Sequence, residues 1–213
     1  MLYIESFGNP RKFARTARRV AASMPVLAVQ VGRSAAGHRA ATSHTAAAAT
    51  PWVTREALFG QAGVIAVSGF GDLIEAAALV ATQPVPKGTT VVIVSNVGGA
   101  GVLAADACTE AGLTVHRPHQ LTRRRLRALI PPGGTAGGPV DTTAAVSAGQ
   151  FRQCLELAVA DEAVSAMIVL ALPTGATGDL VAAIQQADVR VRLLPGTDDG
   201  RQIPAYGYPE AAA

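Results

Sequence analysis

The sequence predicts an α/β protein of two units, each built from a parallel sheet between layers of helices. Short apolar runs alternate with segments of helical periodicity along almost the whole chain, as in repeated strand–helix units. The chain is 49% hydrophobic but only 4% aromatic, and its many small residues let helices pack closely on a buried sheet. The stretch PVPKG interrupts the alternation and predicts a linker near residue 86.

The first array occupies residues 1–86 and contains too few strands for a complete doubly wound sheet. Strands are expected at 1–4, 25–31 and 64–67. Helices are expected at 9–23, 50–63 and 69–83. Asn9 is suited to cap the first helix with Pro10 at its first position, and the Gly- and Ala-rich stretch 32–50 is expected to be a loop. Small sheets of this class usually carry about five strands, so the first unit is expected to be truncated at its N-terminus.

The second array, residues 87–203, is long enough for a complete flavodoxin-like unit. Strands are expected at 89–96, 113–117, 164–172 and 189–194. Helices are expected at 98–112, 121–130, 148–162 and 178–188. Residues 131–143 are rich in Gly and Pro and are expected to form a loop, and residues 204–213 are expected to be a tail without periodicity.

Composition and charge exclude several classes of function. The formal net charge is +3, and the one dense basic cluster, Arg123–Arg127, contains no aromatic residue, so we expect a solvated helix face and no nucleic-acid partner. No apolar run approaches the roughly 20 residues of a membrane span, and no secretory signal is present. Cys108 and Cys154 fall in helical segments and are expected to be buried free thiols, which favours a cytoplasmic location.

The stretch SNVGGAGVLAADA, 95–107, is a candidate phosphate-binding turn. A strand ends, glycines follow and a helix begins, so backbone N–H groups and the helix dipole favour an anion there. Gly98, Gly99, Ala100 and Gly101 would bring that backbone close to a phosphate, and Asn96 is a candidate supporting residue. The alternative is a tight strand-to-helix turn that binds nothing.

The same stretch matches the G-x-G-x-x-A dinucleotide pattern at Gly99, Gly101 and Ala104. A nicotinamide site expects an acidic residue at the end of the next strand, but that strand ends in His116 and Arg117. Because an arginine suits a 2′-phosphate, an NADP-binding protein remains as a further alternative.

The stretch GGPVDTT, 137–143, lies where the carboxyl end of a sheet would open. Asp141 is a candidate supporting residue of a site there. Capping of the following helix by Asp141, Thr142 or Thr143 is the commoner use of such side chains.

His44 lies between Ser43 and Thr45 in the expected long loop. An isolated loop histidine is more often incidental, but loops of this length in compact domains are usually functional or disordered. A neutral imidazole can attack a phosphoryl group when an acidic residue orients its other nitrogen, and Glu5, at the end of the first strand, suits that role. No metal-ligand spacing, G-x-S-x-G turn or Walker P-loop occurs in the chain.

These motifs together resemble the NDP-forming acyl-CoA synthetases, the superfamily of succinyl-CoA synthetase and ADP-forming acetyl-CoA synthetase. The superfamily includes the CoA-ligase-like part of bacterial GNAT protein acetyltransferases. The resemblance covers nearly the whole chain and runs in family order through the following segments: ESFGNPRKF, GRSAAGHRAATSHT, FGQAGVI, VVIVSNVGGAGVLAADA, GGPVDTT and IPAYGYPE.

The resemblance implies that His44 is the phosphorylated histidine and Glu5 the glutamate that orients it. Gly98 to Gly101 would start one of two helices whose N-termini hold the phosphate. The implied reaction converts acyl-CoA, phosphate and NDP into acid, CoA and NTP, so CoA and ATP or ADP with Mg²⁺ serve the complete enzyme. CoA-binding and ATP-grasp domains or subunits are the implied partners, the tail 204–213 would lead toward the ATP-grasp domain, and a homodimer is a further expectation.

Two positions depart from the family pattern. Ala46 follows Ser43–His44–Thr45 where the family often has glycine, and Gly138 precedes Pro-Val-Asp where it often has asparagine. These departures favour an alternative in which the fold is catalytically silent, binds CoA or an acyl-CoA, and regulates a protein lysine acetyltransferase. The isolated chain is not expected to turn over by itself.

Overall fold

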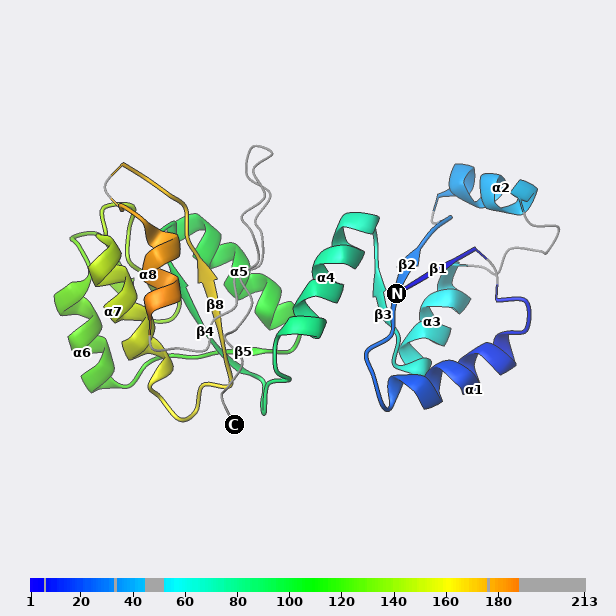
Figure 1. The fold of residues 1–213 in the computed structure, drawn as a ribbon, viewed down its shortest axis with the longest axis horizontal. Coiled ribbons are helices and arrows are strands. Elements are labelled where there is room, and N and C mark those ends of the chain that lie inside the picture. Colours follow the sequence, from blue (N-terminus) through cyan, green and yellow to red (C-terminus); the bar gives the residue numbers. More distant parts are fainter. Residues whose placement is uncertain (6, 33, 45–51, 176, 188–213) are drawn as a thin grey trace. The chain divides into compact units, whose positions relative to one another are not determined.

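Figure 1 shows the computed structural model, which describes residues 1–187 except 6, 33, 45–51 and 176. The side chains of residues 30, 38, 41–44, 52 and 53 also lie outside the description. The chain divides into two compact units, one containing Met1–Pro84 and the other spanning Val85–Val191. No helix in the described part of the chain is long and apolar enough to cross a membrane.

The first unit is built on a three-stranded parallel sheet, as the sequence predicts. Its order is β1 (Leu2–Ile4), β2 (Leu27–Gln30) and β3 (Ile65–Val67), with β2 in the centre. Successive side chains of a strand point to opposite faces. Accordingly, Ala28 packs in a cluster with helices on one face, whereas Leu27 and Val29 pack against Leu73 on the other.

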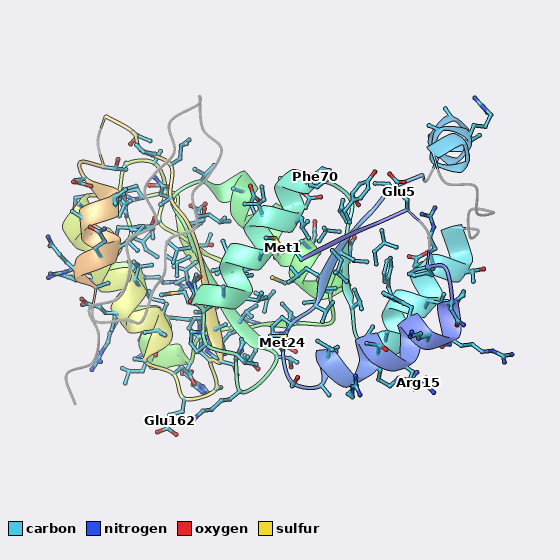
Figure 2. All side chains as sticks on the ribbon, turned by 45° about the vertical axis from the view of Figure 1, so that its right-hand side comes forward. Met1, Glu5, Arg15, Met24, Phe70 and Glu162 are labelled. Atoms are coloured by element: carbon cyan, nitrogen blue, oxygen red, sulfur yellow. The ribbon has the colours of Figure 1, made fainter. Side chains whose placement is uncertain are left out.

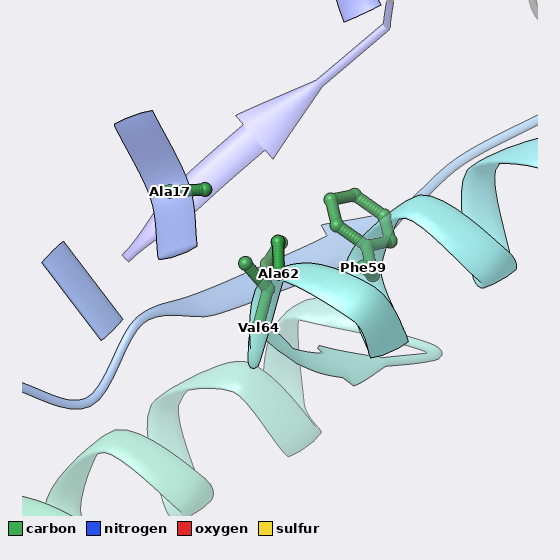
Figure 3. Close-up of a cluster of buried hydrophobic side chains, with 5 residues drawn as sticks. Ala17, Phe59, Ala62 and Val64 are labelled. Carbon is green, nitrogen blue, oxygen red and sulfur yellow. The ribbon is translucent and has the colours of Figure 1, made fainter. Parts of the chain in front are cut away.

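Helices cover both faces of this sheet. The elements are α1 (Pro10–Ala21), α3 (Trp52–Ala62) and α4 (Phe70–Thr82). Asn9 caps α1, since its side chain accepts a hydrogen bond from the backbone N–H of Lys12 at 2.9 Å. Figure 3 shows Phe59 of α3 beside Ala17, Ala62 and Val64 in the core between α1, α3 and the sheet.

Residues 35–44 correct the predicted loop, because they form a helix, α2 (Ala35–His44). Ser34 Oγ accepts a hydrogen bond from the backbone N–H of Gly37 at 3.0 Å, which is the contact of an N-cap. Alanine, the strongest helix former, supplies much of this segment. This segment has no regular apolar stripe, so its hydrophobic periodicity does not predict a helix.

The second unit is organised around β4 (Thr90–Ser95), whose residues from Val91 onward are all buried. β8 (Ala166–Leu170) pairs in parallel with β4 along its length. β5 (Thr114–Val115) pairs with the beginning of β4 and β7 (Val140–Asp141) with its end. The described sheet is therefore mainly parallel and confirms the predicted α/β class.

In the described part of this unit four helices flank the sheet, with α5 on one side of the strands and α6, α7 and α8 on the other, which makes three layers (Figure 1). They are α5 (Gly98–Glu110), α6 (Gln120–Leu129), α7 (Ala148–Val159) and α8 (Leu180–Gln186). Cys108 and Cys154 are free and buried, as predicted. Burial raises the pKa of the Cys154 thiol to about 12, so this cysteine is unreactive at neutral pH.

Two predictions for residues 131–150 were wrong. The expected loop contains β6 (Thr135–Ala136) and β7, an antiparallel pair that attaches to β4. Strands of two residues fall below what periodicity can detect. The N-cap of α7 is Ser147, in a reciprocal capping box with Gln150, and Asp141, Thr142 and Thr143 do not cap this helix. The predicted strand at 189–194 and the tail 204–213 lie outside the described residues.

We predict that Ser147→Ala lowers the free energy of unfolding by about 1 kcal/mol, because the substitution removes the acceptor for the Gln150 N–H. Urea unfolding followed by circular dichroism measures the change. Ser23→Ala is the matched control, since the exposed Ser23 hydroxyl donates to the Val20 carbonyl oxygen at the other end of a helix. An equal loss for both variants would contradict a special role for the cap.

Candidate functional site

The turn between β4 and α5 is held by side chains from its own residues. Ser95 Oγ donates to the carbonyl oxygen of Val97 at 2.8 Å and accepts from the N–H of Val97 at 2.9 Å. The Ser95 carbonyl oxygen accepts from both the backbone N–H and the hydroxyl of Thr142, at 2.8 and 3.0 Å. These buried bonds fix where α5 begins.

Asn96, a predicted supporting residue, ties the turn to the segment that follows β8. Its Nδ2 donates to the Leu172 carbonyl oxygen at 2.7 Å, and its Oδ1 accepts from the Leu172 N–H at 2.8 Å. Asn96 is buried and both polar atoms of its amide are satisfied. The side chain therefore continues the strand pairing beyond β4 and is committed to structure.

The predicted phosphate-binding residues form the first turn of α5. Val97 precedes the helix and provides no side-chain cap. No hydrogen bond within the described residues ends on the N–H groups of Gly98, Gly99 or Ala100, whereas the Gly101 N–H bonds to the Val97 carbonyl oxygen at 3.1 Å. Free N–H groups and the positive end of the helix dipole can stabilise an anion at this turn.

Asp141 already brings a negative charge to this turn. A Cβ added at Gly98 would lie 2.6 Å from Asp141 Oδ2, so the carboxylate rests directly against the first residue of α5. Its Oδ1 accepts from the Thr143 N–H at 2.9 Å. A phosphate at the α5 turn would therefore share the helix dipole with Asp141 and be repelled by its charge.

Gly138, one of the two departures from the family pattern, has a backbone reason in this fold. Its φ of +80° lies in the left-handed region. A Cβ there would lie 2.2 Å from the carbonyl oxygen of His116. Any side chain at this position would displace the backbone of the residues that follow β5, so only glycine fits the packing here.

The dinucleotide pattern falls inside the helix rather than before it. Gly99, Gly101 and Ala104 all belong to α5, whereas the first glycine of a nucleotide fingerprint makes the turn between strand and helix. A Cβ at Gly101 would lie 3.5 Å from the Cβ atoms of both Ser95 and Pro139, so this glycine serves close packing of α5 on the sheet. This geometry gives the NADP alternative no support.

In the first unit, Glu5 directly follows the end of β1 and so lies at the carboxyl edge of the sheet (Figure 2). Tyr3 donates its hydroxyl to Glu5 Oε1 at 3.0 Å. This hydrogen bond, with some burial and the negative charge of Glu5, raises the pKa of Tyr3. Glu5 keeps a second carboxylate oxygen that could orient a histidine.

His44 is the last residue of α2, which starts five residues after the end of β2. Both β1 and β2 run in the same direction, with Ile4 opposite Gln30, so Glu5 and the lead-in to α2 leave the same edge of the sheet. The side chains of Ser43 and His44, together with Thr45, lie outside the described residues. Their pairing with Glu5 stays a prediction.

A cluster of His116, His119 and Asp161 was missed by the sequence reasoning. His116 Nε2 lies 3.0 Å from Asp161 Oδ2, and His119 Nε2 lies 3.4 Å from the same oxygen. The cluster joins the end of β5, the start of α6 and the segment after α7. No motif marks it, since Asp161 lies more than 40 residues after both histidines in sequence. In the described part of the chain, no group of three or more His, Cys, Asp or Glu could hold a metal ion.

Comparisons with known proteins match both units. Residues 1–80 match the succinyl-CoA ligase-like flavodoxin domain, and residues 91–194 match the ligase-CoA domain. The chain is 32% identical over 204 residues to acetate–CoA ligase [ADP-forming] II subunit alpha of Pyrococcus furiosus, which covers 96% of this chain and 44% of that protein. It is 34% identical over 183 residues to acetate–CoA ligase [ADP-forming] I of Archaeoglobus fulgidus, covering 86% of this chain and 26% of the relative.

A solved structure agrees with these matches. The dinucleotide-forming acetyl-coenzyme A synthetase 1 of Ca. Korarchaeum cryptofilum, in complex with phosphate and ADP, superposes with a TM-score of 0.75 at 27% identity. The superposition covers 87% of this chain and 42% of that chain. The chain thus spans less than half the length of each of these relatives.

We predict opposite outcomes for two neighbouring glycines of the α5 turn. Gly98→Ala destabilises the protein by about 1 kcal/mol, because the new methyl group displaces the Asp141 carboxylate, which accepts from the Thr143 N–H. Gly99→Ala changes stability by less than about 1 kcal/mol, because nothing lies within 4 Å of its Cβ position. Urea unfolding measures both. Asp141→Ala in the Gly98→Ala background should recover stability, and a failure to do so would disprove the clash.

We predict that Asp161→Asn flattens the acid side of the stability profile. The backbone N–H of Ala163 holds the pKa of Asp161 below its usual value, partial burial opposes this, and His116 and His119 reinforce it. The stabilisation is therefore present above about pH 4, the unfolded pKa, and is lost as pH falls through the lower folded pKa. Urea unfolding at stepped pH values tests this. Parallel profiles for Asp161→Asn and the wild type would contradict it.

Proposed function

Since the chain belongs to the succinyl-CoA synthetase-like family of NDP-forming acyl-CoA ligases, we propose that it is the phosphate-relay part of an ADP-forming acyl-CoA ligase. The observation that carries the proposal is the 32% identity to an ADP-forming acetate–CoA ligase alpha subunit, which extends over 96% of the chain. The implied reaction is reversible, and acetate is the acid named in the two curated relatives described above.

The proposed chemistry is two successive phosphoryl transfers. Phosphate displaces CoA from the acyl-CoA and leaves an acyl phosphate. A neutral ring nitrogen of His44 attacks the phosphorus, and the P–O bond to the acyl carboxylate breaks to release the acid. An oxygen of the ADP β-phosphate then attacks the phosphohistidine, the P–N bond breaks, and ATP leaves. Glu5 orients the imidazole by accepting a hydrogen bond from its other nitrogen.

The first unit supports the roles of Glu5 and His44 through its topology. Glu5 follows β1 at the carboxyl edge of a parallel sheet, and the neighbouring strand β2 leads into the helix that ends at His44. Carboxyl edges are where parallel α/β sheets bind ligands. Ser43 and Thr45 are proposed to support the phosphohistidine with their hydroxyl groups.

The second unit supports a phosphate-binding role for the first turn of α5. Gly98, Gly99 and Ala100 have free N–H groups, and Gly101 allows the helix to pack closely on the sheet. Asp141 limits the affinity through its charge, which favours a phosphate that is held briefly and passed on. The second departure, Gly138, is compatible with this role because the fold accommodates glycine there.

The complete enzyme requires CoA, ATP or ADP and Mg²⁺, and the proposed partners are CoA-binding and ATP-grasp domains or subunits. We assign the Mg²⁺ to the nucleotide in the ATP-grasp part, since the described residues contain no ligand set for a metal. We interpret residues 1–86 as the phosphohistidine domain, 87–203 as the ligase-CoA domain and 204–213 as the connection toward an ATP-grasp domain. A cytoplasmic location and a homodimer belong to the same proposal.

The alternative of a silent acyl-CoA sensor attached to a lysine acetyltransferase has less support. Both curated relatives described above are named as ligases, and neither is named as an acetyltransferase. The departure at Ala46 is the remaining sequence feature in its favour. Loss of a measured ligase activity in His44→Ala would decide against it.

We predict that His44 becomes phosphorylated when the chain is mixed with ATP, Mg²⁺ and an ATP-grasp partner subunit. Mass spectrometry under alkaline handling, which preserves phosphohistidine, locates the phosphate. His44→Asn should abolish the label, and Glu5→Gln should slow its appearance at least tenfold by releasing the imidazole. His38→Asn is the matched control in the same helix and should label normally. The relay would be disproved if His44 carries no phosphate while the same ATP-grasp partner phosphorylates a related ligase alpha subunit.

A further inference from the structure

Arg55 occupies a position that helical periodicity assigns to the core. It lies on α3 four residues before Phe59 and seven before Ala62, so the three share one face of the helix. Their exposed fractions are 2% for Arg55, 2% for Phe59 and 1% for Ala62. A buried arginine on an apolar face is costly unless its charge is balanced, so its presence calls for a partner.

Within the described residues, no contact balances the charge of Arg55. Nη2 donates to the carbonyl oxygen of Gly32 at 3.3 Å, and the buried Nε has no hydrogen-bond partner. No carboxylate pairs with Arg55 among the described residues, and the sequence from 41 to 54 contains no Asp or Glu. The adjacent Glu56 is exposed. Among the described residues Arg55 has one neutral acceptor, whereas a guanidinium has five donors.

The guanidinium meets the segment that opens α2. Gly32 has a φ of +72°, and a Cβ there would lie 3.3 Å from Arg55 Nη2. The chain folds back on itself at this point, since a Cβ at Gly37 would lie 3.2 Å from the Gly32 Cα atom and 3.3 Å from Ser34 Oγ. The bond from Arg55 therefore ends beside the first turn of α2.

The first turn of α2 has backbone N–H groups without a hydrogen-bond partner among the described residues. The Gly37 N–H is satisfied by Ser34, but no described hydrogen bond ends on the N–H groups of Ala35 or Ala36. Ser34, Ala35 and Ala36 are exposed, so a ligand can approach from solvent. A ten-residue helix directs its positive end toward this turn, and a buried positive charge lies next to it.

We propose that Arg55 and the first turn of α2 form an oxyanion site that binds a phosphoryl group, separate from the α5 turn. A phosphoryl group offers several oxygens in a tetrahedral arrangement, which can accept from Ala35 and Ala36 while another faces the guanidinium. The two negative charges of a phosphoryl group also balance the arginine and the helix dipole better than the single charge of a carboxylate does. The site rests in part on the proposed function, since it would place a phosphate at the beginning of the helix that ends in His44.

The direct test is a titration of the isotopically labelled chain with inorganic phosphate, followed by NMR at constant ionic strength. Saturable shifts of the Ala35 and Ala36 amides and of the Arg55 Nε–H signal are expected, with a common dissociation constant. A titration that leaves these three signals unmoved would overturn the site. Shifts confined to the amides of Gly98–Gly101 would also overturn it.

Variants test the role of the guanidinium. Arg55→Met keeps the length and apolar stem of the side chain and should weaken phosphate binding at Ala35 and Ala36 at least tenfold. Arg55→Lys keeps a positive charge, so its phosphate affinity should lie between those of the wild type and Arg55→Met. This variant supplies a result if Arg55→Met does not fold. Arg18→Met is the matched control, since Arg18 is an exposed arginine that also donates to a carbonyl oxygen, that of Gln61 at 3.2 Å. Equal affinity in wild type and Arg55→Lys or Arg55→Met would disprove the proposal.

Two sources of the phosphoryl group can be distinguished with the same signals. Binding of CoA but not of dephospho-CoA at Ala35 would identify the 3′-phosphate of CoA, whereas binding of inorganic phosphate alone would identify the reacting phosphate. The site and the relay can fail separately. Phosphate shifts at Arg55 without phosphorylation of His44 would retain the site and remove the relay, and phosphorylation without those shifts would do the reverse.

Discussion

The second unit depends on the burial of β4 from Val91 onward. Both edges of this strand are used, one by β8 along its length and the other by β5 and β7 at its two ends. At its carboxyl end β4 leaves the sheet. There the Ser95 and Asn96 side chains replace the missing strand bonds, and the chain turns into α5. The candidate phosphate turn is thus a direct consequence of how β4 ends.

The two units present their helix N-termini with opposite local charge. At α5 the carboxylate of Asp141 rests against Gly98, so a phosphate must compete with a resident negative charge. At α2 the guanidinium of Arg55 contacts Gly32, and the local field attracts an anion. A relay needs phosphate to bind and then leave, and sites of unequal strength suit that requirement. Burial strengthens the effect of Arg55, because water screens a buried charge poorly.

Sequence reasoning succeeded where one local signal governs the structure. The cap at Asn9 and the apolar runs of the central strands each follow from a few adjacent residues. It failed where hydrophobic periodicity was absent, or where two residues were equally suited to the same role. The helix at 35–44 lacks an apolar stripe, and β6 and β7 are too short to show alternation. Asp141 is a residue type that often caps helices, but Ser147 is equally suited to cap α7 and does so. Tertiary packing places the Asp141 carboxylate against the first residue of α5 instead.

The sequence by itself determined the α/β class, the three-strand sheet of the first unit and the family, because periodicity and motif order are properties of the chain. It also identified Glu5, His44 and Gly98–Gly101 as the residues to consider. Only the tertiary structure decided what surrounds them. It committed Asn96 to Leu172, brought Asp141 against Gly98 and buried Arg55 beside Gly32, contacts that join residues between 23 and 76 positions apart. Such contacts depend on strand order and helix packing, which no local pattern encodes.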